Sequence, residues 1–252
     1  MTRSASKWAT GVYDALVAVL LAPVCAACRV PLDAPTRGAV CDSCWRQISP
    51  LTPPICDCCG DSLPSWRRVS LSQGRCPRCR RGSTAVRRTR SVGVYDGSLR
   101  LIVHALKYGG RRSIARHLGT LMREQGSEVL NGADVVVPVP LHPLRHLSRG
   151  FNQADDLARE LGLPVWRGLR RTRHGPPQAS LPAARRAANV RSAFAVSRPP
   201  PSLSLIVVLI DDVMTTGETM DECGRVLREA GVVTVRGLTV ARAAAALPRA
   251  PP

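Results

Sequence analysis

The chain has 252 residues and an apolar fraction of 44%, which is enough for one large folded domain or two small ones. No apolar run reaches about eighteen residues, so the sequence predicts no membrane-spanning helix. The formal net charge is +18 and comes almost entirely from arginine, because the only lysines are Lys7 and Lys107.

The N-terminal segment combines basic residues with a long apolar stretch. The stretch "YDALVAVLLAPVCAAC" follows Arg3 and Lys7, a pattern that a secretory signal would share. Asp14 interrupts the apolar stretch, however, and no small-x-small cleavage site follows it. We therefore predict an N-terminal helix over residues 1–24 and a cytoplasmic protein.

The positive charge is concentrated in two stretches that contain no acid. Residues 62–95 hold nine arginines, and residues 161–210 hold eight. Such runs repel themselves unless they are solvated or meet phosphate. Two interpretations stay open here: a solvated basic surface, or a binding surface for phosphate esters or nucleic acid.

Nine of the ten cysteines lie before residue 80, and eight of them form four CxxC pairs. A CxxC turn points two sulfur atoms at one place, and two such turns complete a tetrahedron around Zn²⁺. A disulfide framework would require a secreted chain, so we predict two structural zinc ions. Interleaved pairing stays open, but sequential pairing is simpler. The sequential ligand sets are Cys25, Cys28, Cys41 and Cys44 for one ion, and Cys56, Cys59, Cys76 and Cys79 for the other.

Residues 25–82 are accordingly predicted to form a small, cysteine-rich double zinc ribbon. A segment of this size, rich in proline and cysteine, buries little apolar area, so zinc should supply most of its folding free energy. Cys58 lies inside a CxxC pair and is either a substitute ligand or a bystander.

Beyond a basic linker over residues 83–91, strands and helices alternate. Buried strands are continuous apolar runs, and the helices are amphipathic segments that stop at glycine. This alternation predicts an α/β fold, a parallel sheet flanked by helices, over residues 92–245, with a disordered tail over residues 246–252. We expect strands within residues 91–97, 133–142, 202–210 and 232–242, and helices within residues 98–110, 111–126, 151–162 and 218–231.

The stretch "VVLIDDVMTTGET", residues 207–219, carries the clearest chemistry. Ligands of parallel sheets bind beyond the carboxyl ends of the strands, and Asp211 and Asp212 directly follow a predicted buried strand. Two adjacent carboxylates are costly unless ribose hydroxyls or a sugar-bound Mg²⁺ meet them. The threonine- and glycine-rich turn that follows opens a helix, where backbone N–H groups can hold a phosphate. The stretch therefore predicts a site for ribose 5-phosphate.

The same stretch resembles the phosphoribosyl pyrophosphate (PRPP) loop of type I phosphoribosyltransferases, in which two acids precede T-T-G-x-T. The stretches "HALKYGGR", "VVVPVPLHPLRHLSRGFNQADDLA" and "PPQASLPAARRAANVRSAFAV" resemble the ComF family, whose members also carry an N-terminal cysteine-knuckle domain. The resemblance extends from Cys25 to about Arg242 and implies a type I phosphoribosyltransferase-like fold.

The resemblance also implies roles for individual residues. Asp211 and Asp212 would be the catalytic acids that hold the ribose hydroxyls. Arg149 would meet the pyrophosphate, Lys107 would add a contact, and residues 173–191 would form a mobile loop over the site. The other expected PRPP-binding residues are Val139 and Pro140 in the pyrophosphate loop and Val213, Met214, Thr215, Thr216, Gly217, Glu218 and Thr219 in the PRPP loop.

Plainer interpretations exist for several polar residues. Arg149, and equally the pair Arg185 and Arg186, could be solvated surface arginines. Histidines that stand alone between proline and arginine are more often loop residues than a metal-binding or catalytic set. The histidines in question are His142, His146 and His174.

Two functions stay open from the sequence. A phosphoribosyltransferase, which is a glycosyltransferase, would transfer the phosphoribosyl group from PRPP with Mg²⁺ to a base such as a nucleobase. Alternatively, the chain would bind single-stranded DNA, without catalysis or under the control of PRPP, and act with the DNA-uptake machinery of natural transformation. The ComF family is associated with that process.

Overall fold

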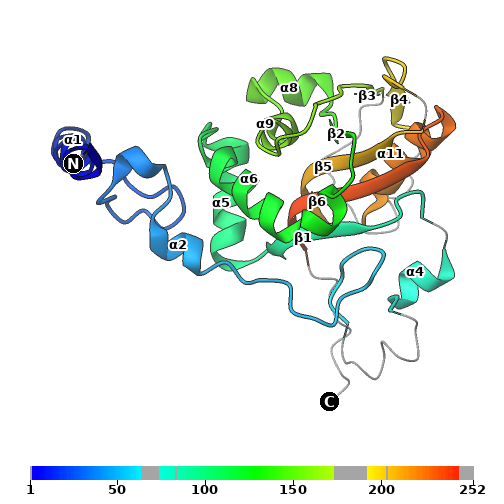
Figure 1. The fold of residues 1–252 in the computed structure, drawn as a ribbon, viewed down its shortest axis with the longest axis horizontal. Coiled ribbons are helices and arrows are strands. Elements are labelled where there is room, and N and C mark those ends of the chain that lie inside the picture. Colours follow the sequence, from blue (N-terminus) through cyan, green and yellow to red (C-terminus); the bar gives the residue numbers. More distant parts are fainter. Residues whose placement is uncertain (1, 64–73, 83, 173–191, 203, 244–252) are drawn as a thin grey trace.

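The structure of the protein is a computed structural model that describes residues 2–63, 74–82, 84–172, 192–202 and 204–243 (Figure 1). The loop expected over residues 173–191, which includes His174, Arg185 and Arg186, lies outside the described residues, as does the tail over residues 246–252. Within the described ranges, no helix is long and apolar enough to cross a membrane.

A four-stranded parallel sheet forms the centre of the larger domain. Its strands are β1 (Thr89–Val94), β2 (Val135–Pro138), β5 (Ile206–Met214) and β6 (Thr234–Arg242). They lie in the order β1-β6-β5-β2, and each neighbouring pair is parallel. Apolar residues dominate β2 and the first half of β5, because a sheet with helices on both faces is buried on both sides. The predicted α/β fold with a parallel sheet is confirmed.

Helices cover both faces of this sheet (Figure 1). They are α5 (Gly97–Tyr108), α6 (Ile114–Gln125), α7 (Ser127–Leu130), α9 (Gln153–Arg159) and α11 (Glu218–Glu229), whereas α8 (Pro143–Arg149) buries none of its residues. In β5, Val208 and Ile210 belong to the apolar core shared with α5, α6 and α9, whereas Val207 and Leu209 belong to the core shared with α11. The alternation follows from the period of two along a strand, which sends successive side chains to opposite faces.

A short antiparallel hairpin adds a second, two-stranded sheet. It pairs β3 (Leu169–Arg171) with β4 (Phe194–Val196). Phe194 is buried in the core shared with α11, which anchors the hairpin to the α11 side of the fold. The sequence did not predict this hairpin, because three residues per strand are too few for an alternating pattern to be recognised.

Two strands extend beyond their predicted limits. β1 begins at Thr89, inside the segment predicted as a linker, because Thr89 and Arg90 already pair with β6. β5 continues past Ile210 to Met214, because its last residues still pair with the end of β6. Asp211 and Asp212 therefore lie within a strand and not after it.

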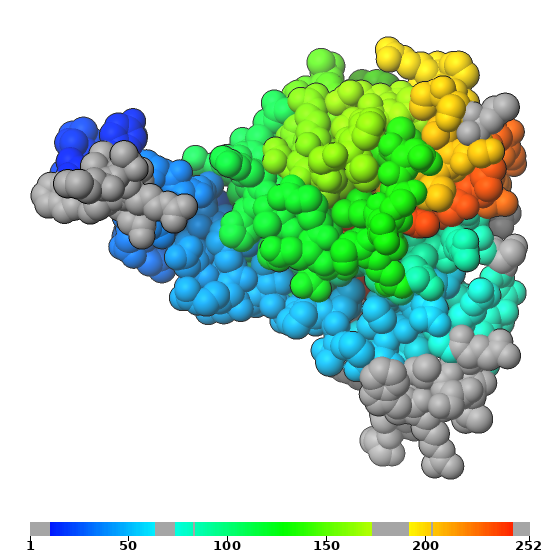
Figure 2. All heavy atoms as spheres, viewed as in Figure 1, coloured from blue at the N-terminus to red at the C-terminus, as the bar shows by residue number. Residues whose placement is uncertain are grey.

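The cysteine-rich segment packs against the larger domain in two places (Figures 1 and 2). The first ribbon, with η1 (Pro35–Arg37) and α2 (Asp42–Arg46), follows α1 (Thr2–Leu21) and lies beside α5. Trp45 of α2 stacks on His117 of α6 with ring centroids 3.9 Å apart. The second ribbon, with α4 (Pro77–Arg81), lies below the sheet in this view. It is joined to β1 by a hydrogen bond in which the backbone N–H of Thr89 donates to the Cys58 carbonyl at 2.6 Å.

Candidate functional site

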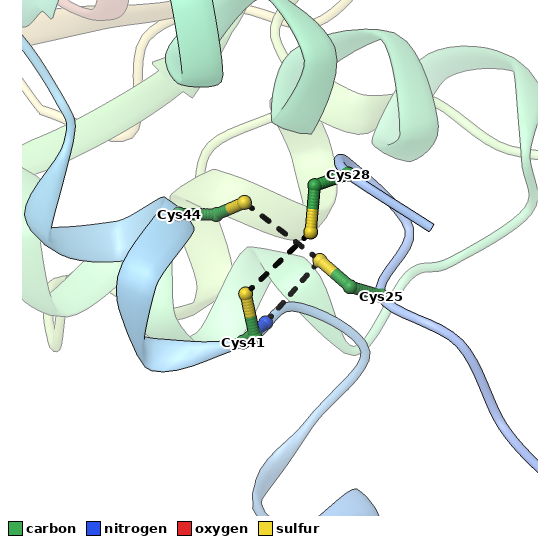
Figure 3. Close-up of side chains that lie close together, drawn as sticks. All are labelled: Cys25, Cys28, Cys41 and Cys44. Carbon is green, nitrogen blue, oxygen red and sulfur yellow. Dashed lines mark hydrogen bonds between the residues drawn. The ribbon is translucent and has the colours of Figure 1, made fainter. Parts of the chain in front are cut away.

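The first cysteine cluster brings together side chains from two CxxC turns (Figure 3). The sulfur atoms of Cys25, Cys28, Cys41 and Cys44 all lie within 4.8 Å of one another. The Sγ–Sγ distance is 3.9 Å between Cys25 and Cys44 and 3.8 Å between Cys28 and Cys41. The backbone N–H of Cys41 donates to Cys25 Sγ at 3.3 Å, which favours a negatively charged sulfur.

The second cluster has the same construction and is fully buried. It contains Cys56, Cys59, Cys76 and Cys79, with 3.7 Å between the sulfur atoms of Cys59 and Cys76. Zn–S bonds of about 2.3 Å in a tetrahedron require sulfur atoms roughly 3.8 Å apart, so both clusters fit Zn²⁺. The grouping in both clusters is sequential and not interleaved.

Cys58 provides a test of this ligand assignment. It lies outside both clusters, with its sulfur 3.2 Å from the Thr84 hydroxyl and 3.9 Å from the Val86 carbonyl oxygen. We expect Cys58→Ser to keep two zinc ions per chain and Cys59→Ser to lose one, as measured by elemental analysis of the purified protein. Loss of zinc from Cys58→Ser would contradict the assignment.

A cavity of about 650 Å³ opens at the carboxyl edge of the sheet. It exists because β2 ends at Pro138, opposite Ile210, whereas β5 continues to Met214. This volume is in the range of pockets that bind small molecules. Its lining includes nine of the expected site residues, which are Lys107, Val139, Pro140, Arg149, Asp211, Asp212, Val213, Thr215 and Thr219.

Asp212 lies on the α5 and α9 side of β5 and is paired there. It is 4% exposed, and its Oδ2 accepts from Lys107 Nζ at 2.9 Å and from Gln153 Nε2 at 2.8 Å. Burial lowers the pKa of Lys107, but the Asp212 carboxylate outweighs it and leaves this pKa raised. Asp212 is therefore already paired with a cation of the protein itself.

Asp211 points to the opposite face of β5, because successive side chains alternate along a strand. Its Oδ1 accepts the backbone N–H of Asp212 at 2.8 Å. Burial, and then the Asp212 charge, raise the pKa of Asp211 to about 8. The two adjacent acids are therefore tolerated because one is paired with a lysine and the other readily takes up a proton.

Arg149 closes a hydrogen-bonded network on the α8 side of the cavity. Its Nη2 donates to the Tyr108 hydroxyl at 3.1 Å, and its guanidinium carbon lies 4.7 Å from the centre of that ring. Its Nη1 donates to Gln153 Oε1 at 3.3 Å, which links it to Asp212 through one side chain. Arg149 is thus held toward the cavity and is not a freely solvated arginine.

The threonine turn faces two different spaces. Thr215 and Thr219 line the large cavity, whereas Met214, Gly217 and Glu218 line a crevice of about 160 Å³ toward the second ribbon. Gly217 precedes α11 with φ 81°, and a Cβ there would lie only 2.6 Å from Met214 Cε. Glycine is therefore required at this position. Thr216 lies in the same turn and is half-buried.

The residues of the cavity that the sequence reasoning missed include Tyr95, Arg145, Gln153 and Arg171. Gln153 stands in the recognised stretch "RGFNQ", so its position carried a usable signal. Arg171 carried none, because the hairpin that positions it was not predicted. Of the histidines considered in the sequence analysis, His142 accepts the Leu144 backbone N–H at 3.2 Å and caps α8, while His146 lines a neighbouring cavity.

Comparisons with known proteins agree with this architecture. Residues 16–80 match the family model of the double zinc ribbon domain, and residues 112–249 match that of the phosphoribosyl transferase domain. The fold and the site thus define a protein with a phosphoribosyltransferase-like domain joined to a double zinc ribbon. The chain belongs to the ComF family, together with the competence proteins and the DNA utilization protein YhgH.

The relatives match over nearly their whole length. The DNA utilization protein YhgH of Salmonella typhimurium is 34% identical over 225 residues, which cover 84% of this chain and 94% of the relative. Competence protein F of Haemophilus influenzae is 29% identical over 230 residues, which cover 87% of this chain and 96% of the relative. Among solved structures, orotate phosphoribosyltransferase from Aeropyrum pernix is 24% identical, with a TM-score of 0.33 over 57% of this chain and 64% of that one.

Proposed function

We propose that the cavity binds PRPP and that the protein transfers its phosphoribosyl group to a second ligand. The observation that carries this proposal is one cavity that holds an acid pair, a threonine turn at a helix N-terminus, and a cluster of cationic side chains. These groups match, in order, the ribose hydroxyls, the 5-phosphate and the pyrophosphate of PRPP.

Different residues of the cavity bind different parts of PRPP in this proposal. Asp211 and Asp212 accept hydrogen bonds from the ribose hydroxyls, and the turn from Val213 to Thr219 holds the 5-phosphate with backbone N–H groups. Arg149, with Val139 and Pro140 beside it, faces the pyrophosphate. Lys107 holds the Asp212 carboxyl group in place through their ion pair.

The proposed reaction is a substitution at C1 of the ribose. The C1–O bond to pyrophosphate breaks, a bond from C1 to the nucleophilic atom of the second ligand forms, and pyrophosphate leaves with the bonding electron pair. Positive charge develops on the sugar, so the protein acts mainly by positioning the reactants and screening charge. A Mg²⁺ ion bound with PRPP would neutralise charge on the pyrophosphate.

A thermal-shift measurement tests PRPP binding. We expect PRPP with Mg²⁺ at about a hundredfold excess over Kd to raise the Tm of the zinc-loaded protein by roughly 5 °C or more. The double variant Asp211→Asn/Asp212→Asn should lose this shift, whereas Glu229→Gln, an exposed acid at the far end of α11, should keep it. Absence of a shift in the unsubstituted protein would contradict the proposal.

The second candidate function is single-stranded DNA binding, and the names of the relatives favour it. The relatives are described as competence and DNA utilization proteins, and the net charge of +18 suits a phosphate backbone. Salt-sensitive binding of an oligothymidylate without any PRPP shift would favour a DNA-binding protein of this fold that does not use PRPP.

A further inference from the structure

Arg171 is a half-buried cation at the edge of the cavity. It ends β3, and its guanidinium carbon lies 5.4 Å from the centre of the Phe194 ring in the paired strand. Within the described residues, its Nε is buried and has no hydrogen-bond partner. Burial, and then the positive charge of Arg145, lower the pKa of Arg171. A buried donor without a partner is costly, so this N–H group is suited to an acceptor that the described residues do not supply.

The described lining of the cavity offers only two carboxyl groups, those of Asp211 and Asp212. None of the residues outside the described ranges is aspartate or glutamate. Within the cavity, Asp212 is already paired with Lys107. The raised pKa of Asp211 reduces the negative charge at the remaining acid. Arg145 and Arg171 both line the cavity and repel each other, so this side of it has an excess of positive charge.

Arg171 lies on a different element from the groups assigned to PRPP. The 5-phosphate belongs to the threonine turn, and the pyrophosphate belongs beside Val139, Pro140 and Arg149. Arg171 instead projects from the β3–β4 hairpin, on the α11 side of the sheet that Asp211 also faces. None of the groups assigned to PRPP lies on this hairpin, so the hairpin is left for a second ligand that approaches the ribose.

We infer that the second ligand of the cavity carries a carboxylate or a phosphate group, which binds to Arg171 together with Arg145. This inference rests on the proposed PRPP site. Such a group could belong to a small carboxylated heterocycle or to the backbone of a nucleic acid, since guanidinium groups pair with both kinds of oxyanion.

Matched probes that differ only in charge test the inference by calorimetry. The full, zinc-loaded chain with PRPP and Mg²⁺ would be titrated with nicotinate and with nicotinamide, and separately with a short oligothymidylate and its uncharged methylphosphonate analogue. Ribose 5-phosphate would replace PRPP if a probe were consumed. We expect the anionic member of one pair to bind at least about tenfold more tightly than its neutral counterpart, and the pair that responds identifies the source of the anion.

Substitutions in β3 provide the matched control. Arg171→Met should abolish the preference for the anionic probe, and Arg171→Lys should retain part of it. Arg170→Met removes the neighbouring arginine, which is exposed and points to the other face of the strand, and should leave the preference unchanged. The PRPP affinity of all three variants should stay within about threefold of the unsubstituted protein.

Each other outcome overturns the inference in an identifiable way. Equal binding within both probe pairs, or a preference that survives Arg171→Met, would overturn it and leave the PRPP site standing. If Arg171→Met weakens PRPP binding about tenfold while the preference for the anionic probe stays, Arg171 binds the pyrophosphate instead. Failure of the unsubstituted protein to bind PRPP would overturn the proposed function and this inference together.

Discussion

Asp211→Asn and Asp212→Asn should change the stability of the ligand-free protein in opposite directions. Asp212→Asn leaves Lys107 buried without a negative partner, so we expect it to lower the free energy of unfolding by about 3 kcal/mol. Asp211→Asn removes a carboxyl whose ionisation the folded state disfavours, so we expect it to raise that free energy by up to about 4 kcal/mol near neutral pH. Urea unfolding of the zinc-loaded protein measures both.

The effect of Asp211→Asn should depend on pH with a defined sign. The pKa of Asp211 is about 8 in the folded state, compared with about 4 in the unfolded chain. Between these values the folded state binds more protons, so the contribution of Asp211 to stability falls as pH rises and becomes constant above the folded-state pKa. The stabilisation by Asp211→Asn should therefore grow from about pH 5 to about pH 8.

Two outcomes would contradict this account of the acid pair. Destabilisation by both variants would mean that Asp211 has a stabilising partner, and a pH-independent effect of Asp211→Asn would mean that its pKa is ordinary. Glu229→Gln serves as the control, because its surface ion pair with Arg225 should be worth less than about 1 kcal/mol. If PRPP binds as proposed, Asp211→Asn should weaken its binding while stabilising the free protein.

Loss of zinc from the second ribbon should weaken PRPP binding far more than loss of zinc from the first. Met214, the last residue of β5, packs among the cysteines of the second ribbon. Arg78 of that ribbon lies beside Gly217, since a Cβ on Gly217 would be 3.0 Å from Arg78 Nη2. Arg242 at the end of β6 is 2% exposed and pairs with Asp61 at 3.2 Å. The second ribbon therefore supports the turn that is proposed to hold the 5-phosphate.

The comparison uses one cysteine from each cluster. We expect Cys79→Ser to lower PRPP affinity at least about tenfold and Cys28→Ser to change it less than about threefold, each with one zinc ion remaining per chain. Hydrogen exchange of residues 215–219 provides a measure that needs no ligand, and it should accelerate in Cys79→Ser only. Met214→Ala keeps both metal sites and should show the same faster exchange, which separates loop support from loss of zinc.

Equal effects of the two cysteine substitutions would show that the ribbons contribute only general stability. Faster exchange over the whole larger domain in Cys79→Ser would point to the same conclusion. The first ribbon is the appropriate reference, because it contacts α5 and α6 through residues such as Trp45 and does not line the cavity.

Local spacing accounts for the parts of the fold that could be predicted. The apolar runs that became β2 and β5 and the glycine-stopped helices were recognisable, because their periods reflect burial on one or both faces. The ends of the strands could not be predicted in the same way. The strand predicted to end at Ile210 continues to Met214, because pairing with β6 decides where β5 ends. Helix α8 and the β3–β4 hairpin were not predicted, because seven and three residues carry too little pattern.

The sequence by itself determined the chemistry that depends on neighbouring residues, namely the four CxxC pairs and the two acids before a threonine turn. The tertiary structure decided which groups meet across the chain. It paired Asp212 with Lys107, left Nε of Arg171 without a hydrogen-bond partner, and placed the second ribbon against Met214. The physical reason is that a turn or a strand end sets the spacing of nearby side chains, whereas the charge state and support of a site depend on contacts between residues far apart in sequence.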